Sequence, residues 1–230
     1  MHDIINVMEW TKKHQKEIID RIILDANLSP ESEPMAIFMA GLPGAGKTEL
    51  SNGFIKVFGP KFIRIDMDEL ATYIEGYQPE KADLFRAGAT RILNNLFDKT
   101  IKKHLDFIMD GTFGSKMALT NVERVLKRGY IVQIAYAFQD PKLAWRFTKA
   151  REKVEHRAIK EDGFLEAYYK TISNLHELAK RNYKNVTIDI FVKNKDNTVG
   201  QRIENVKDSQ IDDILKVIYN KDKLKEYIES

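Results

Sequence analysis

The stretch Gly41-Leu42-Pro43-Gly44-Ala45-Gly46-Lys47-Thr48 matches the pattern G-x-x-x-x-G-K-[ST] at every position. Such a stretch forms a loop whose backbone N–H groups surround nucleotide phosphates, and its glycines let the chain curl without Cβ clashes. The lysine reaches the β- and γ-phosphate oxygens, and the hydroxyl ligates Mg²⁺. We therefore predict that residues Gly41 to Glu49 bind ATP or GTP together with Mg²⁺, with Thr48 as a metal ligand.

Strand and helix patterns alternate on both sides of this loop. Apolar runs predict strands at 35–40, 61–66, 106–110, 130–137 and 186–192, with a candidate extra strand at 198–203. Helical patterns occur at 6–27, 49–58, 79–104, 116–128, 141–158, 163–181 and 208–228. This alternation predicts an α/β fold of three layers, with a mostly parallel five-stranded sheet and helices on both of its faces.

We expect one domain over residues 1–230. It would comprise a helical N-terminal extension at 1–33, a lid at 140–163, and a C-terminal strand and helix at 194–230. The hydrophobic content of 43% is sufficient for one core at this length.

The charge balance and the absence of cysteine exclude several classes of protein. Lys and Arg number 37 against 34 Asp and Glu, and a net charge of +3 is too small to indicate a nucleic-acid partner. With no cysteine, disulfides and thiolate metal sites are excluded. No apolar run approaches the ~20 residues of a membrane span, and no basic leader precedes the first helix. We expect a cytoplasmic protein that binds neither membranes nor nucleic acid.

Two aspartates lie at the end of the predicted strand at 61–66. Ligands of such sheets bind at the carboxyl ends of the strands. A kinase that phosphorylates a hydroxyl also needs a nearby carboxylate to accept the hydroxyl proton. Asp66 or Asp68 fits this role, with the other orienting Mg²⁺-bound water, and the spacing does not choose between them. In the structural alternative, Asp68 caps a helix that begins near Glu69 and Asp66 merely ends the strand.

The predicted strand at 106–110 ends in Asp110-Gly111-Thr112. An apolar strand that ends in aspartate beside a phosphate loop is the arrangement that holds the Mg²⁺ shell, so Asp110 is a candidate metal ligand. Gly111 would let a substrate approach the backbone, and Thr112 offers a hydroxyl. The structural alternative is a plain turn after an edge strand.

Basic residues gather in the predicted lid. A mobile helix that closes over the nucleotide would exclude water and bring arginine forks to the charge that develops during phosphoryl transfer. Surface ion pairs explain some of these cations equally well, because Arg151 and Glu155 are four apart. Arg151 and Arg157 are six apart, so the helix must break or bend if both contact phosphate. The lid cations are Arg146, Lys149, Arg151, Lys153 and Arg157.

The ordered set of these features resembles the zeta toxin family of P-loop kinases, whose studied members phosphorylate UDP-N-acetylglucosamine with ATP. The resemblance runs from about Asn6 to Asn194. It implies a phosphotransferase that depends on ATP and Mg²⁺, a nucleotide-sugar acceptor, and a small helical antitoxin as a separate chain. The matching features are the N-terminal helix, the phosphate loop, Ile65-Asp66-Met67-Asp68, Asp110-Gly111-Thr112, Asp140-Pro141 and the basic segment from Lys149 to Arg157.

The resemblance also implies a role for individual residues on the ATP side. Lys47 resembles the ATP-binding lysine of the family. Asp68 resembles its catalytic base, which favours Asp68 over Asp66. Arg151 and Arg157 resemble the two lid arginines that contact ATP, and Arg151 is the more secure match because the spacing here is shorter than in well-known members.

On the substrate side the chain departs from the family. Members that bind the UDP-sugar carry a glutamate in the helix before the strand that ends at Asp110, and an ungapped count places Asn94 or Asn95 there. A basic residue that commonly follows the I-D-x-D-x-x segment is Ala71 here.

The residues expected around the acceptor are therefore Asp66, Asn94, Asp110 and Thr112. Two alternatives stay open for the function. One is a kinase of another alcohol, such as an antibiotic or a nucleoside. The other is a module that binds a protein partner and uses ATP only to order its loops.

Overall fold

The protein is described here by a computed structural model that covers residues 6–58, 62–155 and 159–230. Within these residues a sheet of six strands has the order β2-β3-β1-β4-β5-β6, and only β6 runs antiparallel to its neighbour. The α/β prediction is confirmed, but the prediction of five strands is wrong, because the candidate strand at 198–203 pairs with β5. The strands are β1 Met35–Ala40, β2 Ile63–Asp66, β3 Phe107–Asp110, β4 Ile131–Phe138, β5 Val186–Lys193 and β6 Val199–Ile203.

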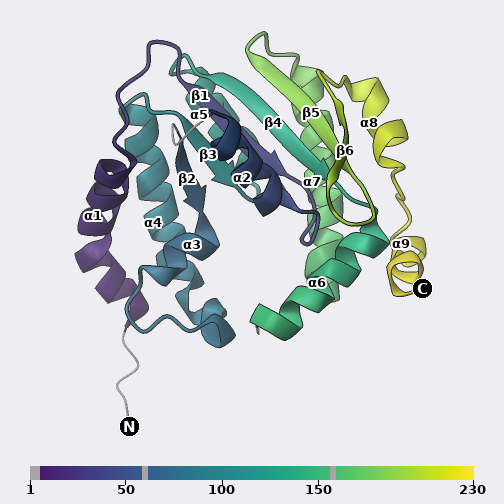
Figure 1. Ribbon diagram of the computed structural model, residues 1–230, viewed down its shortest axis with the longest axis horizontal. Coiled ribbons are helices and arrows are strands. Elements are labelled where there is room, and N and C mark those ends of the chain that lie inside the picture. The colour runs from purple at the N-terminus through teal and green to yellow at the C-terminus, as the bar shows by residue number, and fades with distance from the viewer. Residues whose placement is uncertain (1–5, 59–61, 156–158) are drawn as a thin grey trace.

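Helices cover both faces of the sheet (Figure 1). In this view α2 lies in front of the sheet and α7 lies behind it, while α1, α3 and α4 gather beyond β2 and α8 beyond β6. The helices are α1 Val7–Ala26, α2 Lys47–Phe58, α3 Met67–Thr72, α4 Ala82–Lys102, α5 Ala118–Leu126, α6 Pro141–Glu155, α7 Glu161–Arg181, α8 Asp208–Leu215 and α9 Lys221–Glu229, with a short 3-10 turn η1 at Pro79–Lys81. None of the helices within the described ranges is long and apolar enough to cross a membrane.

The position of β1 in the sheet determines where the phosphate loop opens. β1 pairs with β3 on one side and with β4 on the other, so the sheet winds outward in both directions from it. The loop after β1 therefore lies at the point of a doubly wound sheet where ligands bind. β1 and β4 are buried on both faces over almost their whole length, as central parallel strands are.

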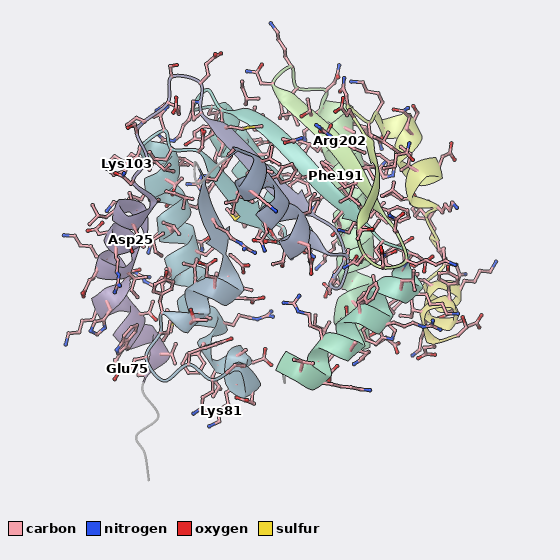
Figure 2. The ribbon with its side chains drawn as sticks, viewed as in Figure 1. Asp25, Glu75, Lys81, Lys103, Phe191 and Arg202 are labelled. Carbon is pink, nitrogen blue, oxygen red and sulfur yellow. The ribbon has the colours of Figure 1, made fainter. Side chains whose placement is uncertain are left out.

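The sixth strand is held to the sheet by side chains as well as by backbone pairing. Arg202 of β6 donates to Oδ2 of the buried Asp189 at 2.6 Å, and its guanidinium lies 5.5 Å from the centre of the Phe191 ring (Figure 2). Both contacts cross from β6 to β5 and so hold Val199–Ile203, the edge strand of the sheet, whose own residues are mostly exposed.

The C-terminal segment contains two helices instead of the predicted single helix at 208–228. α8 ends at Leu215, and Lys216 adopts the left-handed conformation, with φ 47°. α9 then begins after Asn220, whose side chain accepts a hydrogen bond from the backbone N–H of Lys223 at 2.9 Å. The prediction is wrong here because a capping asparagine starts a new helix within a segment of continuous apolar periodicity.

Candidate active site

The phosphate loop lies at the centre of the carboxyl edge of the sheet. Gly44 and Gly46 both have φ of 76°, a conformation that residues with a Cβ adopt only under strain. The backbone N–H of Gly41 donates to the carbonyl of Thr112 at 3.3 Å, which ties the loop to the segment after β3. α2 begins at Lys47, so its N-terminal N–H groups and the positive end of its dipole adjoin the loop.

Lys47 is half-buried and hydrogen-bonded within the loop. Its Nζ donates to the carbonyl oxygen of Leu42 at 2.7 Å. Burial lowers the pKa of Lys47 to about 8, the negative charges of Asp110 and Asp66 oppose this shift, and the positive charge of Arg151 adds to it. Lys47 thus lies within electrostatic range of three of the predicted site residues.

Asp66 and Asp110 lie side by side at the ends of two adjacent strands. They are directly paired in the parallel register of β2 and β3. Their carboxylates share one cation, because Nη2 of Arg64 lies 2.8 Å from Oδ2 of Asp110 and 3.3 Å from Oδ2 of Asp66. The hydroxyl of Ser51, in α2, also donates to Oδ2 of Asp110 at 3.1 Å. Burial and the like charge of Asp110 raise the pKa of Asp66.

Arg64 was not predicted from the sequence. The available signal was its position two residues before Asp66, because alternate residues of a strand share one face of the sheet.

Asp66, and not Asp68, caps the short helix that follows β2. Its Oδ1 accepts the backbone N–H of Asp68 at 2.8 Å, and α3 begins at Met67. Asp68 occupies the first turn of this helix. The alternative in which Asp68 caps a helix beginning near Glu69 is therefore wrong. Asp66 has a structural role at this position that Asp68 does not have.

Thr112 links the phosphate loop to the helix layer behind the sheet. Besides accepting from Gly41, its carbonyl accepts from the hydroxyl of Thr171 in α7 at 2.9 Å, and its own hydroxyl accepts from the backbone N–H of Gly114 at 3.2 Å. β3 lies between β2 and β1, so the alternative of a turn after an edge strand is wrong.

The two asparagines on α4 point in different directions. Nδ2 of Asn95 donates to Oε1 of Gln15 in α1 at 2.6 Å, so Asn95 faces the N-terminal helix. Asn94 is exposed and lies one helical turn after Thr90, whose hydroxyl lies 3.6 Å from the sulfur of Met67 in α3. Of the two positions, Asn94 is the one that shares a helix face with a neighbour of the acidic segment. Ala71 is buried.

The first turns of α6 pack against the phosphate loop, and Arg151 lies one turn before the C-terminal end of this helix. A Cβ on Gly44 would lie 2.2 Å from the carbonyl oxygen of Ala144, which explains the glycine. Lys149 is turned aside: its Nζ donates to Oε2 of Glu152 at 2.8 Å and lies 4.6 Å from the centre of the Trp145 ring. The segment predicted as a lid, 140–163, contains the end of α6 at Glu155 and the start of α7 at Glu161, and Arg157 lies outside the described residues.

A turn between β5 and β6 covers the loop from the other side. A Cβ on Gly46 would lie 2.7 and 2.9 Å from the amide atoms of Asn197 and 2.9 Å from Cε of Lys193. Nε2 of Gln139, directly after β4, donates to the carbonyl of Asn194 at 2.8 Å and so fixes this turn. Burial lowers the pKa of Lys193. These residues were not predicted; the signal was an asparagine-rich turn directly after a strand.

The donor set suits magnesium. The Thr48 hydroxyl and the Asp110 carboxylate are hard oxygen ligands, and Mg²⁺ is usually held by one or two such groups together with phosphates and water. No group of three or more His, Cys, Asp and Glu side chains that could hold a metal occurs within the described residues.

Solved structures of other proteins have a similar fold. The structure is similar to one from the PezAT chromosomal toxin-antitoxin system of Streptococcus pneumoniae, with a TM-score of 0.71, 16% identity and coverage of 94% of both chains. It is also similar to a structure of the complex AvrRxo1-ORF1:AvrRxo1-ORF2, with a TM-score of 0.67 and 12% identity over 90% of this chain and 74% of that one. No curated protein matches the sequence. A family model described as Zeta toxin matches residues 19–205, more than half of the chain. The chain therefore belongs to the zeta toxin family and has the fold of P-loop kinases.

Proposed function

We propose that the protein is an ATP- and Mg²⁺-dependent kinase that transfers the γ-phosphoryl group to a hydroxyl of a nucleotide-activated sugar similar to UDP-N-acetylglucosamine. The observation that carries the proposal is the convergence of Lys47, Asp66 and Asp110 beside the phosphate loop, where both aspartates act on the charge of Lys47 and are paired at the ends of adjacent strands. A phosphate-binding cation beside carboxylates is the arrangement that phosphoryl transfer to a hydroxyl requires.

In this proposal each predicted site residue has a role in the transfer of the γ-phosphoryl group. Lys47 exchanges the Leu42 carbonyl for the β- and γ-phosphate oxygens. Asp68 accepts the proton of the acceptor hydroxyl as its oxygen bonds to phosphorus and the bond to the leaving ADP oxygen breaks. Arg151, and Arg157 by family resemblance, neutralise charge on the equatorial oxygens. Thr48 and Asp110 would hold Mg²⁺, which offsets phosphate charge when it is bound.

The acceptor side is proposed to lie between α3 and α4. Asp66, Thr112 and Asn94 are the residues we assign to it. The support for Asn94 is its place on the same face of α4 as Thr90, which contacts α3. Recognition of a sugar nucleotide at this position would use an amide, which donates and accepts hydrogen bonds, in place of the family's acceptor-only glutamate.

A second candidate is a kinase of another alcohol, such as an antibiotic or a nucleoside. It is favoured by the same substitution, because Asn95 is engaged with α1 and Asn94 carries no charge. It is favoured also by Ala71, whose buried side chain offers no cation to an anionic acceptor.

A panel assay separates these functions. The protein is incubated with Mg²⁺ATP and, in separate reactions, UDP-sugars, nucleosides and aminoglycosides, and products heavier by one phosphate are sought by mass spectrometry. We expect a phosphorylated UDP-sugar. Phosphorylation of another alcohol alone would establish the second candidate. ATP binding without transfer to any acceptor would favour the nucleotide-dependent interaction module.

We also propose a small helical antitoxin as partner. The support is the family and the likeness to a structure from a system that is described as toxin-antitoxin. Co-purification of the chain with the product of a neighbouring reading frame, and loss of ATP binding in the complex, are the expected observations.

A further inference from the structure

Arg64 is a cation inside the carboxylate cluster that the proposed mechanism does not use. Its side chain is only 19% exposed, although it belongs to a four-residue strand at the side of the sheet. Its Nη1 donates to Oδ1 of Asn52 in α2 at 3.0 Å, and its Nη2 faces both Asp110 and Asp66. Arg64 thereby joins α2, β2 and β3 directly below the phosphate loop.

A third carboxylate, that of Glu69, lies near the remaining nitrogen of the Arg64 guanidinium. Nε of Arg64 is buried and has no hydrogen-bond partner among the described residues, and the nearest carboxylate oxygen recorded for it is Oε2 of Glu69 at 3.9 Å. Three carboxylates therefore surround one guanidinium. Carboxylates on adjacent strands repel each other in a partly buried site, and a divalent cation between them would relieve that repulsion.

The guanidinium contacts one oxygen of each of these two carboxylates. The contacts recorded for the Asp110 carboxylate, from Arg64 and from Ser51, both end on Oδ2. The contact recorded between Arg64 and Asp66 also ends on Oδ2, while Oδ1 of Asp66 accepts the N–H of Asp68. Because the Arg64 guanidinium already compensates the Asp66 and Asp110 carboxylates, a divalent ion that arrives without nucleotide gains little binding energy from them.

We propose that Arg64 takes the place of a divalent cation between Asp66 and Asp110, and that it thereby makes Mg²⁺ binding conditional on the nucleotide. The inference rests on the proposed kinase function, whose metal must arrive with ATP. The triphosphate supplies additional oxygen ligands, and Thr48 adds its hydroxyl. Arg64 is a positioning residue: it keeps Oδ2 of Asp110 turned toward itself and compensates the pair without contacting substrate.

A titration of the full chain with Mn²⁺ tests the proposal directly. The paramagnetic resonance signal of free Mn²⁺ measures how much of the ion is bound. In the wild type we expect weak binding without nucleotide and binding at least ~10-fold tighter with ADP. In Arg64→Met we expect nucleotide-free Mn²⁺ binding to strengthen by at least ~10-fold, because the carboxylates lose their resident cation. Equal nucleotide-free affinities in Arg64→Met and the wild type would overturn the proposal.

Two further variants control for charge and for folding. Arg124→Met removes the same charge from a surface pair with Asp98 and should leave nucleotide-free Mn²⁺ binding unchanged. Arg64→Lys keeps a cation and should keep binding weak; tight binding in Arg64→Lys would contradict the role of the charge.

If circular dichroism shows that Arg64→Met does not fold, the test rests on nucleotide-free Mn²⁺ binding to the wild type and to Arg64→Lys. Tight Mn²⁺ binding without nucleotide would then refute the inference. The Mn²⁺ titration needs no acceptor substrate. A negative result in the panel assay would therefore count against the proposed kinase function, and a negative result in the Mn²⁺ titration would count against the role of Arg64.

Discussion

The ammonium group of Lys47 donates to the carbonyl oxygen of Leu42 at 2.7 Å, so the phosphate-binding lysine of the free protein is held by its own loop. This contact replaces the phosphate oxygens that the lysine would neutralise. The loop is thereby preorganised, but its cation is partly removed from water, and burial lowers the pKa of Lys47 to about 8.

Nucleotide binding should consequently take up a proton at alkaline pH. With a pKa of about 8, a substantial share of Lys47 is neutral at pH 8.5, and bound phosphates raise its pKa and restore its charge. We expect a measurable proton uptake on ATP binding at pH 8.5 and a much smaller one at pH 7. Calorimetry in two buffers of different ionisation enthalpy measures this uptake.

Excess Mg²⁺ in these titrations keeps the triphosphate fully ionised at both pH values, so the buffer dependence reports on the protein. Heats that do not depend on the buffer at pH 8.5 would mean that Lys47 is already charged in the free protein.

Replacement of the two aspartates after β2 should have unequal effects. Asp68→Asn removes the proposed base and should lower kcat by ~10²–10⁴-fold while the Kd for ATP changes little. Asp66→Asn keeps a good helix cap, because asparagine also accepts the Asp68 N–H, and its loss in kcat should be smaller. Steady-state kinetics together with ATP titration provide the comparison. A larger kcat loss in Asp66→Asn would assign the base to Asp66, whose raised pKa would suit that role.

Arg151 and Lys149 form a matched pair on α6. Arg151→Met should lower kcat by ~10²-fold or more, because its charge acts on the same region as that of Lys47. The same change should raise the pKa of Lys47, since one nearby positive charge is lost, and so reduce proton uptake at pH 8.5. Lys149→Met should stay close to the wild type, because Lys149 contacts Glu152 and Trp145. Equal losses in the two variants would mean that α6 contributes only general positive charge.

The parts of the site that could be predicted from the sequence are those whose chemistry fixes their spacing. A phosphate loop needs its glycines, lysine and threonine at set positions, and a strand end presents its aspartate at one edge, so Lys47 and Asp110 could be predicted to lie near each other, as they do. The contact of Asn197 with Gly46 joins residues far apart in the chain and depends on the pairing of β6 with β5. Such a contact follows from tertiary packing, which a local pattern does not report.

The contacts of Arg64, a residue of strand β2, also could not be predicted from a local pattern. Alternation places it on the face of Asp66, but only the register of β2 with β3 brings Asp110 to the same guanidinium. The break at Lys216 was likewise missed, because the apolar residues on both sides of it continue one helical pattern.

Replacement of Gly46 and of Gly53 by alanine should have opposite effects on stability, because only Gly46 packs against the β5–β6 turn. Gly46→Ala places a methyl group against Asn197 and Lys193 at φ 76°, and should destabilise the protein by ~1–3 kcal/mol and weaken ATP binding. Gly53→Ala lies within α2, where a Cβ would meet no described atom within 4 Å, and should stabilise the protein by ~0.5–1 kcal/mol. Urea unfolding of both variants measures the difference. A stabilised Gly46→Ala would mean that the turn moves away from the loop.

The family and the catalytic geometry together predict that the activity harms a cell that lacks the partner. Induced expression of the wild type in a bacterial host should arrest growth, and Lys47→Ala should abolish the arrest, because the phosphates lose the cation that binds them. Arg124→Met serves as the matched control, since it removes one charge from a surface pair outside the loop and should remain toxic. Growth must be compared at equal protein levels by immunoblot, because an unstable variant would also be harmless. A wild type that accumulates without slowing growth would separate the kinase chemistry from toxicity, whereas an equally toxic Lys47→Ala would show that the harm does not require phosphoryl transfer.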